Sequence, residues 1–301
     1  NDDYRGLGDW DANLEKLPGG IKGLSEKVEA MGLDFGLWFE LEMINMDSDL
    51  YRAHPDWIIN APGRFPSHAR HQHVLDYSRK EVVDYIYEKV AKILRESKIS
   101  YIKWDMNRYM SEPYSATLPP ERQGEMMHRY ILGVYDLYHR LTTKFPDILF
   151  ESCASGGARF DAALLYYAPQ AWCSDDSDAA ERAKIQYGSS IAYPIVSIGA
   201  HVSAVPNQQL YRNTPLETRA NMAYFGTFGY ELDLNLLSPS EIEEVKREIL
   251  FMKEHRRLIQ IEGDFYRLLS PFEGNECGFS VVSPDKTEAI AMYFQKLNFV
   301  N

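Results

Sequence analysis

The sequence predicts an α/β fold: a (β/α)8 TIM barrel whose first strand is expected upstream of the chain, followed by an antiparallel β domain. Three observations predict it. Strand-like and helix-like segments alternate through most of the 301 residues, which is typical of parallel strands joined by helical crossovers. Acidic residues follow several of these strands, where barrel enzymes carry their reactive groups. From about Gly263 onward, short strands separated by turns replace the alternation.

Seven parallel strands are expected, one fewer than a closed barrel needs. They are rich in β-branched and aromatic residues, which favour strands. These strands span residues 33–40, 72–77, 99–105, 147–152, 170–174, 194–200 and 228–233.

Helices are expected between the strands. Ser78 and Glu81 have the spacing of a capping box, and an apolar stripe through Val82, Ile86 and Val90 follows. Further helices are expected over residues 120–144, 178–190 and 216–225. Ser238 and Glu241 form a second capping box, with proline at the first helical position, that opens a helix over residues 238–257.

Two domains follow from this pattern. Residues 1–260 would form the barrel, truncated at its N-terminus. Residues 261–301 would begin a C-terminal β-sandwich, with strands starting near Phe265, Gly278 and Ala289.

Composition excludes several function classes. The net charge is -12 and no run of Lys or Arg is present, so a nucleic-acid partner is not expected. No apolar run approaches the ~20 residues that span a membrane. Cys153, Cys173 and Cys277 lack disulfide-framework or zinc spacing, which predicts a reducing, cytoplasmic location. Aromatic residues make up 13% of the chain, which suits sugar stacking, although core packing explains most aromatic residues in proteins.

The most informative segment surrounds Asp105, at the end of the strand over residues 99–105. In extended chain Lys103, Asp105 and Asn107 share one face, while Trp104 points away into the core. A cation two residues before a carboxylate keeps that carboxylate ionised. This arrangement suits a nucleophilic or metal-binding aspartate.

Asp175 and Asp176 supply a second carboxylate at the end of a later strand. Glycoside hydrolysis needs two carboxylates that face one sugar, and Asp105 and Asp175 are the candidates. The competing interpretation is that the acidic cluster caps a helix. Both hold if Ser177 or Asp178 caps the helix while Asp175 faces the barrel mouth.

Other residues near strand ends have competing interpretations. Glu40 and Glu42 are rival catalytic acids, but acids at strand ends are more often solvated or placed behind a site. Trp38 shares the face of Glu40 and is either a sugar platform or a core residue.

His71 and His73 would share one strand face and could bind a metal, but apart from His201 no further ligand completes a site, so neither metal nor cofactor is expected. Cys153 lacks an evident histidine base. Gly156 and the glycine after it would let the backbone approach a ligand closely.

Taken together, these segments resemble glycoside hydrolase family 36, the microbial α-galactosidases. The resemblance spans nearly the whole chain in order, and its most specific motif is Lys103-Trp-Asp-Met-Asn-Arg108. The other matching motifs are Gly6-Leu-Gly-Asp-Trp10, Phe35-Gly-Leu-Trp-Phe-Glu40, Glu42-Met43, His54-Pro-Asp-Trp57, Val74-Leu-Asp-Tyr77, Glu151-Ser-Cys-Ala-Ser-Gly-Gly157, Arg159-Phe-Asp161, Ser174-Asp-Asp-Ser-Asp178, Gly199-Ala-His-Val-Ser203 and Gly229-Tyr-Glu-Leu-Asp233.

The resemblance implies a retaining exo-α-galactosidase that acts on melibiose- or raffinose-type oligosaccharides, as a homo-oligomer (a tetramer) in its full-length form. Asp105 would be the nucleophile and Asp175 the acid/base, with Asp176 as the fallback, and their carboxyl groups would lie about 5–5.5 Å apart. Around the galactosyl group the resemblance places Trp38, Arg70, Lys103, Asn107, Cys153, Ser155 and Gly156.

The chain departs from the family at Leu41, where proline is usual, and the family's Asp-Asp pair on the first strand is expected upstream. Alternatives on the same scaffold are an α-N-acetylgalactosaminidase and a transglycosylase. Outside it stand a non-catalytic sugar-binding relative and a metal-dependent barrel hydrolase.

Overall fold

The computed structural model describes residues 5–297 and divides the chain into two compact units. Unit 1 comprises the residues up to Ser155 together with Asp161–Pro169. Unit 2 comprises Gly156–Phe160 and the residues from Gln170 onward. Each unit has its own core of buried apolar side chains. No helix within residues 5–297 combines the length and the apolar composition of a membrane span.

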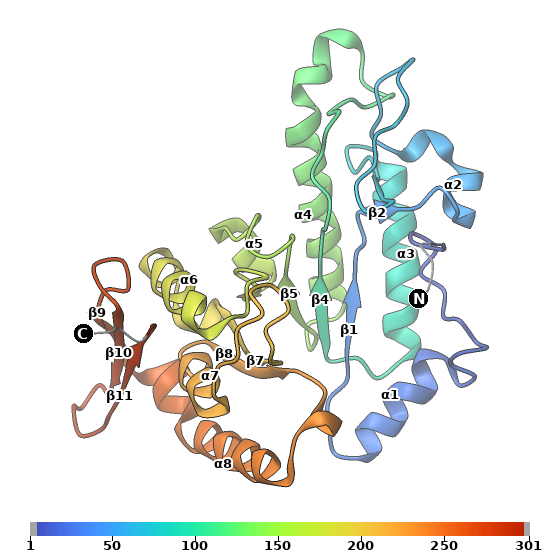
Figure 1. The fold of residues 1–301 in the computed structure, drawn as a ribbon. Helices are drawn as coiled ribbons and strands as arrows, with labels where there is room; N and C mark the ends of the chain where they lie inside the picture. The colour runs from blue at the N-terminus through green and yellow to red at the C-terminus, as the bar shows by residue number, and fades with distance from the viewer. Residues whose placement is uncertain (1–4, 298–301) are drawn as a thin grey trace. The chain divides into compact units, whose positions relative to one another are not determined.

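Unit 1 is built on a parallel sheet in which β4 lies between β1 and β5. The register pairs Trp38 with Lys103 and Lys103 with Glu151. Figure 1 shows helices α3 and α4 running alongside strands β1 and β4. The elements of unit 1 are α1 Gly20–Ala30, β1 Gly36–Phe39, β2 Met43–Ile44, α2 Asp49–Ala53, β3 His73–Val74, α3 Lys80–Glu96, β4 Tyr101–Trp104, α4 Met126–Lys144, β5 Leu149–Ser152 and α5 Ala162–Tyr167, with 3-10 turns at Pro55–Trp57 and Pro120–Glu125.

Amphipathic sequences dock the helices of unit 1. The apolar stripe of α3 is buried through Val82, Ile86 and Val90, as the spacing predicted. Trp104 is fully buried and stacks on Tyr138 of α4 with ring centroids 4.0 Å apart, which confirms its core role. Trp104 thus fixes the end of β4, directly before Asp105.

Two predictions in unit 1 are wrong. The segment 72–77 is not a parallel barrel strand, because β3 pairs antiparallel with β2 in an excursion that follows β1. The Ser78 capping box does not form, because its hydroxyl donates to Asp76 Oδ1 at 2.5 Å and α3 begins at Lys80. Helix α1 was not predicted.

Unit 2 contains a parallel pair, β7 and β8, and a β-bridge that joins Ala171 of β6 to Ile198. Three antiparallel strands in the order β11-β10-β9 follow, which confirms the predicted change from alternating strands and helices to short strands. Its elements are β6 Gln170–Ala171, α6 Ala179–Ala192, β7 Gly199–Ser203, α7 Leu216–Ala223, β8 Thr227–Glu231, α8 Pro239–Arg256, a π-helical turn Arg257–Glu262, β9 Asp264–Leu269, β10 Glu276–Val282 and β11 Ala289–Gln295, with 3-10 turns at Ile195–Ser197 and Leu234–Leu236.

Helix starts in unit 2 follow the sequence closely. Asp178 caps α6 by accepting from the backbone of Ala180 and Glu181, and the predicted capping box of Ser238 and Glu241 opens α8. The α/β architecture with a C-terminal antiparallel sheet is thus as predicted. The hydrogen-bonded strands within the described residues do not form a closed barrel.

Gly133 sets the approach of α4 to the chain before α3, because a Cβ at this position would overlap the carbonyl oxygen of Tyr77. Gly133→Ala is expected to lower the free energy of unfolding by about 1–3 kcal/mol or more. Gly23 in α1 is the matched control: a Cβ there meets nothing within 4 Å, so Gly23→Ala should stabilise the protein by about 0.5–1 kcal/mol. Denaturant unfolding measures both, and equal effects of the two substitutions would contradict the packing argument.

Candidate active site

The Asp105 carboxylate lies directly after β4, 7% exposed and surrounded by hydrogen-bond donors. Its Oδ2 accepts from Trp38 Nε1 at 3.1 Å and from Asn107 Nδ2 at 2.7 Å, and its Oδ1 accepts from the backbone of Met106 at 2.8 Å. Burial alone would raise the pKa of this carboxyl. Hydrogen bonds from Asn107, Cys153, Trp38 and Met106 outweigh burial and lower the pKa. Asp105 is therefore held ionised.

The hydrogen-bond donors, rather than Lys103, supply most of this stabilisation. Lys103 Nζ lies 2.9 Å from Glu151 Oε1, its partner in register on β5. Burial opposes the charge of Lys103, and the adjacent Glu151 carboxylate raises its pKa. Tyr101 also donates to Glu151. Lys103 is thus fixed beside Asp105 by its neighbour strand.

Trp38 is 46% exposed although its indole nitrogen is bound to Asp105. An indole that is anchored at one end and open at its face suits stacking on an apolar sugar surface. This geometry favours the platform interpretation over core packing for Trp38.

Of the two structural roles expected for Glu40 and Glu42, solvated or placed behind a site, the solvated one is excluded, because both residues are buried. Glu40 is 2% exposed and accepts from the backbone of Asn107 at 2.9 Å. Glu42 is fully buried and accepts from Trp104 Nε1 at 3.0 Å and from the Tyr130 hydroxyl. Both carboxylates are thus bound by donors from other segments of unit 1.

The segment after β5 also contacts Asp105. The Ser155 backbone donates to Asp105 Oδ1 at 3.4 Å, and its hydroxyl donates to Asn107 Oδ1 at 3.2 Å. Ser155 has a φ of 47°, in the left-handed region that side chains rarely adopt, and Cys153 is 4% exposed. The structure thus brings Trp38, Asn107, Cys153 and Ser155 together around one carboxylate.

Arg70 lies in an exposed turn before β3, and both Arg70 and His71 have positive φ, 54° and 59°. His71 therefore does not share a strand face with His73, as the metal interpretation required. Burial lowers the pKa of His73 to about 4, with further lowering by Arg108. Within residues 5–297, no group of three His, Cys, Asp or Glu side chains could hold a metal ion.

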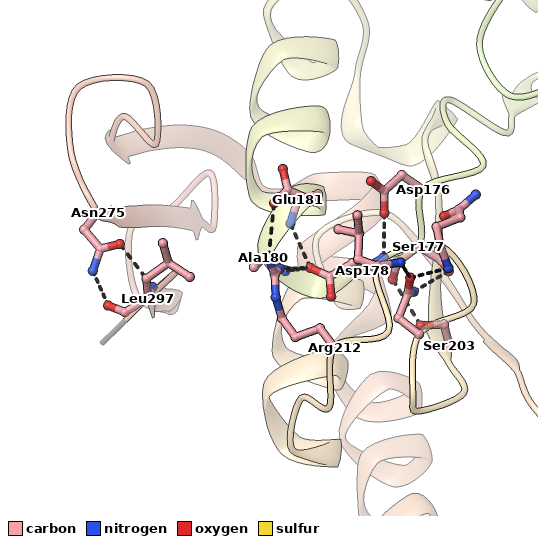
Figure 2. A network of polar contacts seen from close by, with 12 residues as sticks. Asp176, Ser177, Asp178, Ala180, Glu181, Ser203, Arg212, Asn275 and Leu297 are labelled. Carbon is pink, nitrogen blue, oxygen red and sulfur yellow. Dashed lines mark hydrogen bonds and ion pairs between the residues drawn. The ribbon is translucent and has the colours of Figure 1, made fainter. Parts of the chain in front are cut away.

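The acidic cluster belongs to unit 2, and Figure 2 shows Asp176 and Asp178 within a network of polar contacts at the start of α6. Asp178 is buried, caps α6 and pairs with Arg212. Asp176 Oδ1 accepts from the Asp178 backbone at 3.1 Å. Asp175 is exposed, and its Oδ1 accepts from Trp172 Nε1 at 3.1 Å. The cluster therefore provides both a helix cap, which is Asp178, and an exposed carboxylate, which is Asp175.

Gly156 and Gly157 allow a close approach between two backbone segments, and the predicted approach to a ligand stays a prediction. A Cβ on Gly156 would lie 2.9 Å from the backbone nitrogen of Asp175, and one on Gly157 would overlap the carbonyl oxygen of Cys173. Gly156 also has a φ of 82°. These glycines hold the Asp175 segment of unit 2.

Glu151 and Gln72 were missed by the sequence analysis. Glu151 could have been found, because β4 and β5 are adjacent parallel strands and an acid at the end of one faces Lys103 on the other. Gln72 gave no signal: its contact to Glu40, 2.8 Å long, crosses 32 residues through an antiparallel excursion.

Asp105 of unit 1 and Asp175 of unit 2 are chemically different carboxylates. Asp105 is buried, ionised and oriented by several donors, as a nucleophile requires. Asp175 is exposed to solvent, and its Oδ1 accepts a hydrogen bond from the Trp172 indole.

Comparison with known proteins gives consistent matches. The melibiase family model matches residues 1–262. The chain is 53% identical over 301 residues to the α-galactosidase AgaA of Geobacillus stearothermophilus, and 48% identical over 299 residues to α-galactosidase 1 of Pediococcus pentosaceus.

Solved structures agree with these matches. The α-galactosidase of Lactobacillus brevis superposes with a TM-score of 0.98 at 52% identity, covering 100% of this chain and 41% of that one. A structure of AgaA in complex with raffinose gives a TM-score of 0.96, covering 98% of this chain and 41% of that one. The chain spans 41% of the length of AgaA and of α-galactosidase 1, and 100% and 99% of its own residues are matched.

Proposed function

We propose, since this chain belongs to the melibiase family, that the whole protein is a retaining exo-α-galactosidase. It would release terminal α-linked galactose from oligosaccharides of the melibiose and raffinose type. The observation that carries the proposal is the Asp105 carboxylate, ionised by the donors of Trp38, Asn107 and Cys153 beside an exposed aromatic face. The raffinose complex of AgaA supports the substrate class.

The proposed reaction is a double displacement. Asp105 attacks the anomeric carbon while Asp175 donates its proton to the glycosidic oxygen, and the bond to the leaving sugar breaks. Asp175 then removes a proton from water, which attacks the same carbon and releases Asp105. The two inversions leave galactose in its original α configuration.

The substrate contacts are proposed by the same reasoning. Trp38 would stack on the galactosyl ring, and Lys103, Asn107, Cys153, Ser155 and Gly156 would line its pocket. Arg70 would reach the sugar from its exposed turn. The fixed ion pair of Lys103 with Glu151 supports a preformed pocket.

We extend the proposal to the architecture. Residues 1–260 would belong to a (β/α)8 barrel, and residues 261–301 would open a β-sandwich. The parallel pairs of both units and the antiparallel sheet β9–β11 support this. Three free cysteines support a reducing, cytoplasmic location. Assembly as a homo-oligomer stays a prediction.

The stereochemistry of the first product tests the function. The complete protein should hydrolyse p-nitrophenyl α-galactoside, and proton NMR should detect α-galactose before mutarotation forms the β anomer. It should turn over the matching α-N-acetylgalactosaminide more slowly. If β-galactose forms first, the retaining mechanism is wrong, and without hydrolysis a sugar-binding role replaces it.

A further inference from the structure

Glu40 is a buried carboxylate beside the site that the proposed reaction does not use. It follows β1 directly and both of its oxygens are bound. Oε1 accepts from the backbone N–H of Asn107 at 2.9 Å, and Oε2 accepts from Gln72 Nε2 at 2.8 Å. Burial and then the nearby charge of Asp105 raise the pKa of Glu40, while Asn107 and Gln72 oppose the rise. Burying a carboxylate is costly unless it is hydrogen-bonded, and here Asn107 and Gln72 supply the hydrogen bonds.

The first partner leads directly to Asp105. Asn107 is held at its backbone by Glu40, and its side chain donates to Asp105 Oδ2 at 2.7 Å. Trp38, two residues before Glu40 in the same segment, donates to the same oxygen. Two sets of contacts therefore connect the Asp105 carboxylate to the β1 segment. One is the direct hydrogen bond from Trp38, and the other runs through Asn107 to Glu40.

The second partner leads to Arg70. Gln72 closes the turn that presents Arg70, since its backbone donates to Ala69 at 2.9 Å. Arg70 and His71 both occupy the left-handed region of φ, so neighbouring contacts must hold this turn. The Gln72 side chain on Glu40 is such a contact.

We infer that Glu40 is a positioning residue: one carboxylate fixes both the Asn107 segment that orients Asp105 and the turn that presents Arg70. This inference rests on the proposed function, because the roles of Asp105 and Arg70 do. Glu40 is not a rival catalytic acid, since it is 2% exposed and both oxygens are bound within the protein. It acts through its neighbours.

Substitutions at Glu40 separate its hydrogen bonds from its charge. In Glu40→Gln the amide oxygen can still accept from Asn107. The new amide nitrogen can donate to Gln72 Oε1, which is buried and has no hydrogen-bond partner among the described residues. Glu40→Ala removes both contacts.

The test measures kcat and KM of the complete protein on p-nitrophenyl α-galactoside. Glu40→Ala should lower kcat about 100-fold, because a misplacement of about 1 Å has that effect. Glu40→Gln should stay within about 5-fold of the wild type, since it keeps the positioning contacts. Gln72→Ala should raise KM about 5–10-fold and leave kcat within about 3-fold, because only the Arg70 turn loosens.

Glu42→Ala is the matched control, since it truncates a buried carboxylate two residues away that binds Trp104 and Tyr130 instead. It should lower the melting temperature and keep kcat within about 3-fold. If Glu42→Ala does not fold, Glu42→Gln replaces it as the control. If Glu40→Ala does not fold, Glu40→Gln and Gln72→Ala together test the inference.

Three results would overturn the inference. They are unchanged kcat in Glu40→Ala, an equal loss of kcat in Glu42→Ala, and unchanged KM in Gln72→Ala. Asp105→Ala, measured in the same series, tests the proposed function separately from the inference about Glu40. If Asp105→Ala keeps near-normal turnover, the proposed function fails and the inference fails with it. If Asp105→Ala is inactive while Glu40→Ala is normal, only the inference fails.

Discussion

Asp105→Ala is expected to lower kcat of the complete protein on p-nitrophenyl α-galactoside by about 10⁴-fold or more, because it removes the attacking group. The carboxylate is ionised by hydrogen bonds from Asn107, Cys153, Trp38 and Met106, so its negative charge is lost together with its oxygens. Steady-state rates measure the loss. Asp105→Asn is the matched variant, since it keeps the shape and acceptor oxygen of the side chain but not the nucleophilic charge, and it should be equally inactive.

Azide distinguishes a missing nucleophile from a damaged fold. In Asp105→Ala, azide can enter the space of the carboxylate and attack the anomeric carbon from the β face as the activated phenolate leaves. The carbon–oxygen bond breaks, a carbon–nitrogen bond forms, and β-galactosyl azide results. Near-normal turnover without azide would refute the role of Asp105, and rescue that yields the α-azide would assign Asp105 the other role.

The strands beside the site could be predicted from local pattern. Apolar and β-branched runs mark residues 33–40, 99–105 and 147–152, and the structure places β1, β4 and β5 within them. The segment 72–77 has the same composition, yet β3 pairs antiparallel with β2. Composition records that a strand is buried, but the partner strand decides its direction, and that partner lies about 30 residues away in the chain.

Local hydrogen-bond competition limited the helix predictions in the same way. Ser238 and Ser78 both have the capping-box spacing, but only Ser238 caps its helix. The Ser78 hydroxyl is taken by Asp76, a buried carboxylate that also accepts from Ser115 at 2.5 Å. A motif predicts a cap only when no stronger acceptor stands beside it.

The sequence predicted several residues that the structure places around Asp105, but not the contacts that hold them there. The motif identified Asp105, and extended geometry grouped it with Lys103 and Asn107. The sequence assigned the ionisation of Asp105 to Lys103, whereas the structure pairs Lys103 with Glu151. The contact of Glu40 with Asn107 spans 67 residues, so no local spacing could record it.

Asp175→Ala is the second large effect, and it should depend on the leaving group. On raffinose, whose leaving sugar needs a proton, kcat/KM should fall about 10³-fold, because a positioned general acid contributes about 10²–10⁴-fold. On 2,4-dinitrophenyl α-galactoside the first step needs no proton, so kcat/KM should fall less than about 10-fold. Competition kinetics with both substrates measure the ratio. A uniform loss on both would contradict an acid role.

Asp176 supplies the control, because the structure gives the two neighbours different tasks. Asp176 Oδ1 accepts from the Asp178 backbone at the start of α6, whereas Asp175 is exposed and held by the Trp172 indole. Asp176→Ala should therefore cost about 1 kcal/mol of stability and retain the leaving-group profile of the wild type. Azide should restore turnover of Asp175→Ala by attacking the β-linked intermediate on Asp105 from the α face, which yields α-galactosyl azide. If Asp176→Ala instead shows the selective loss on raffinose, the acid/base is Asp176 and the Asp175 assignment falls.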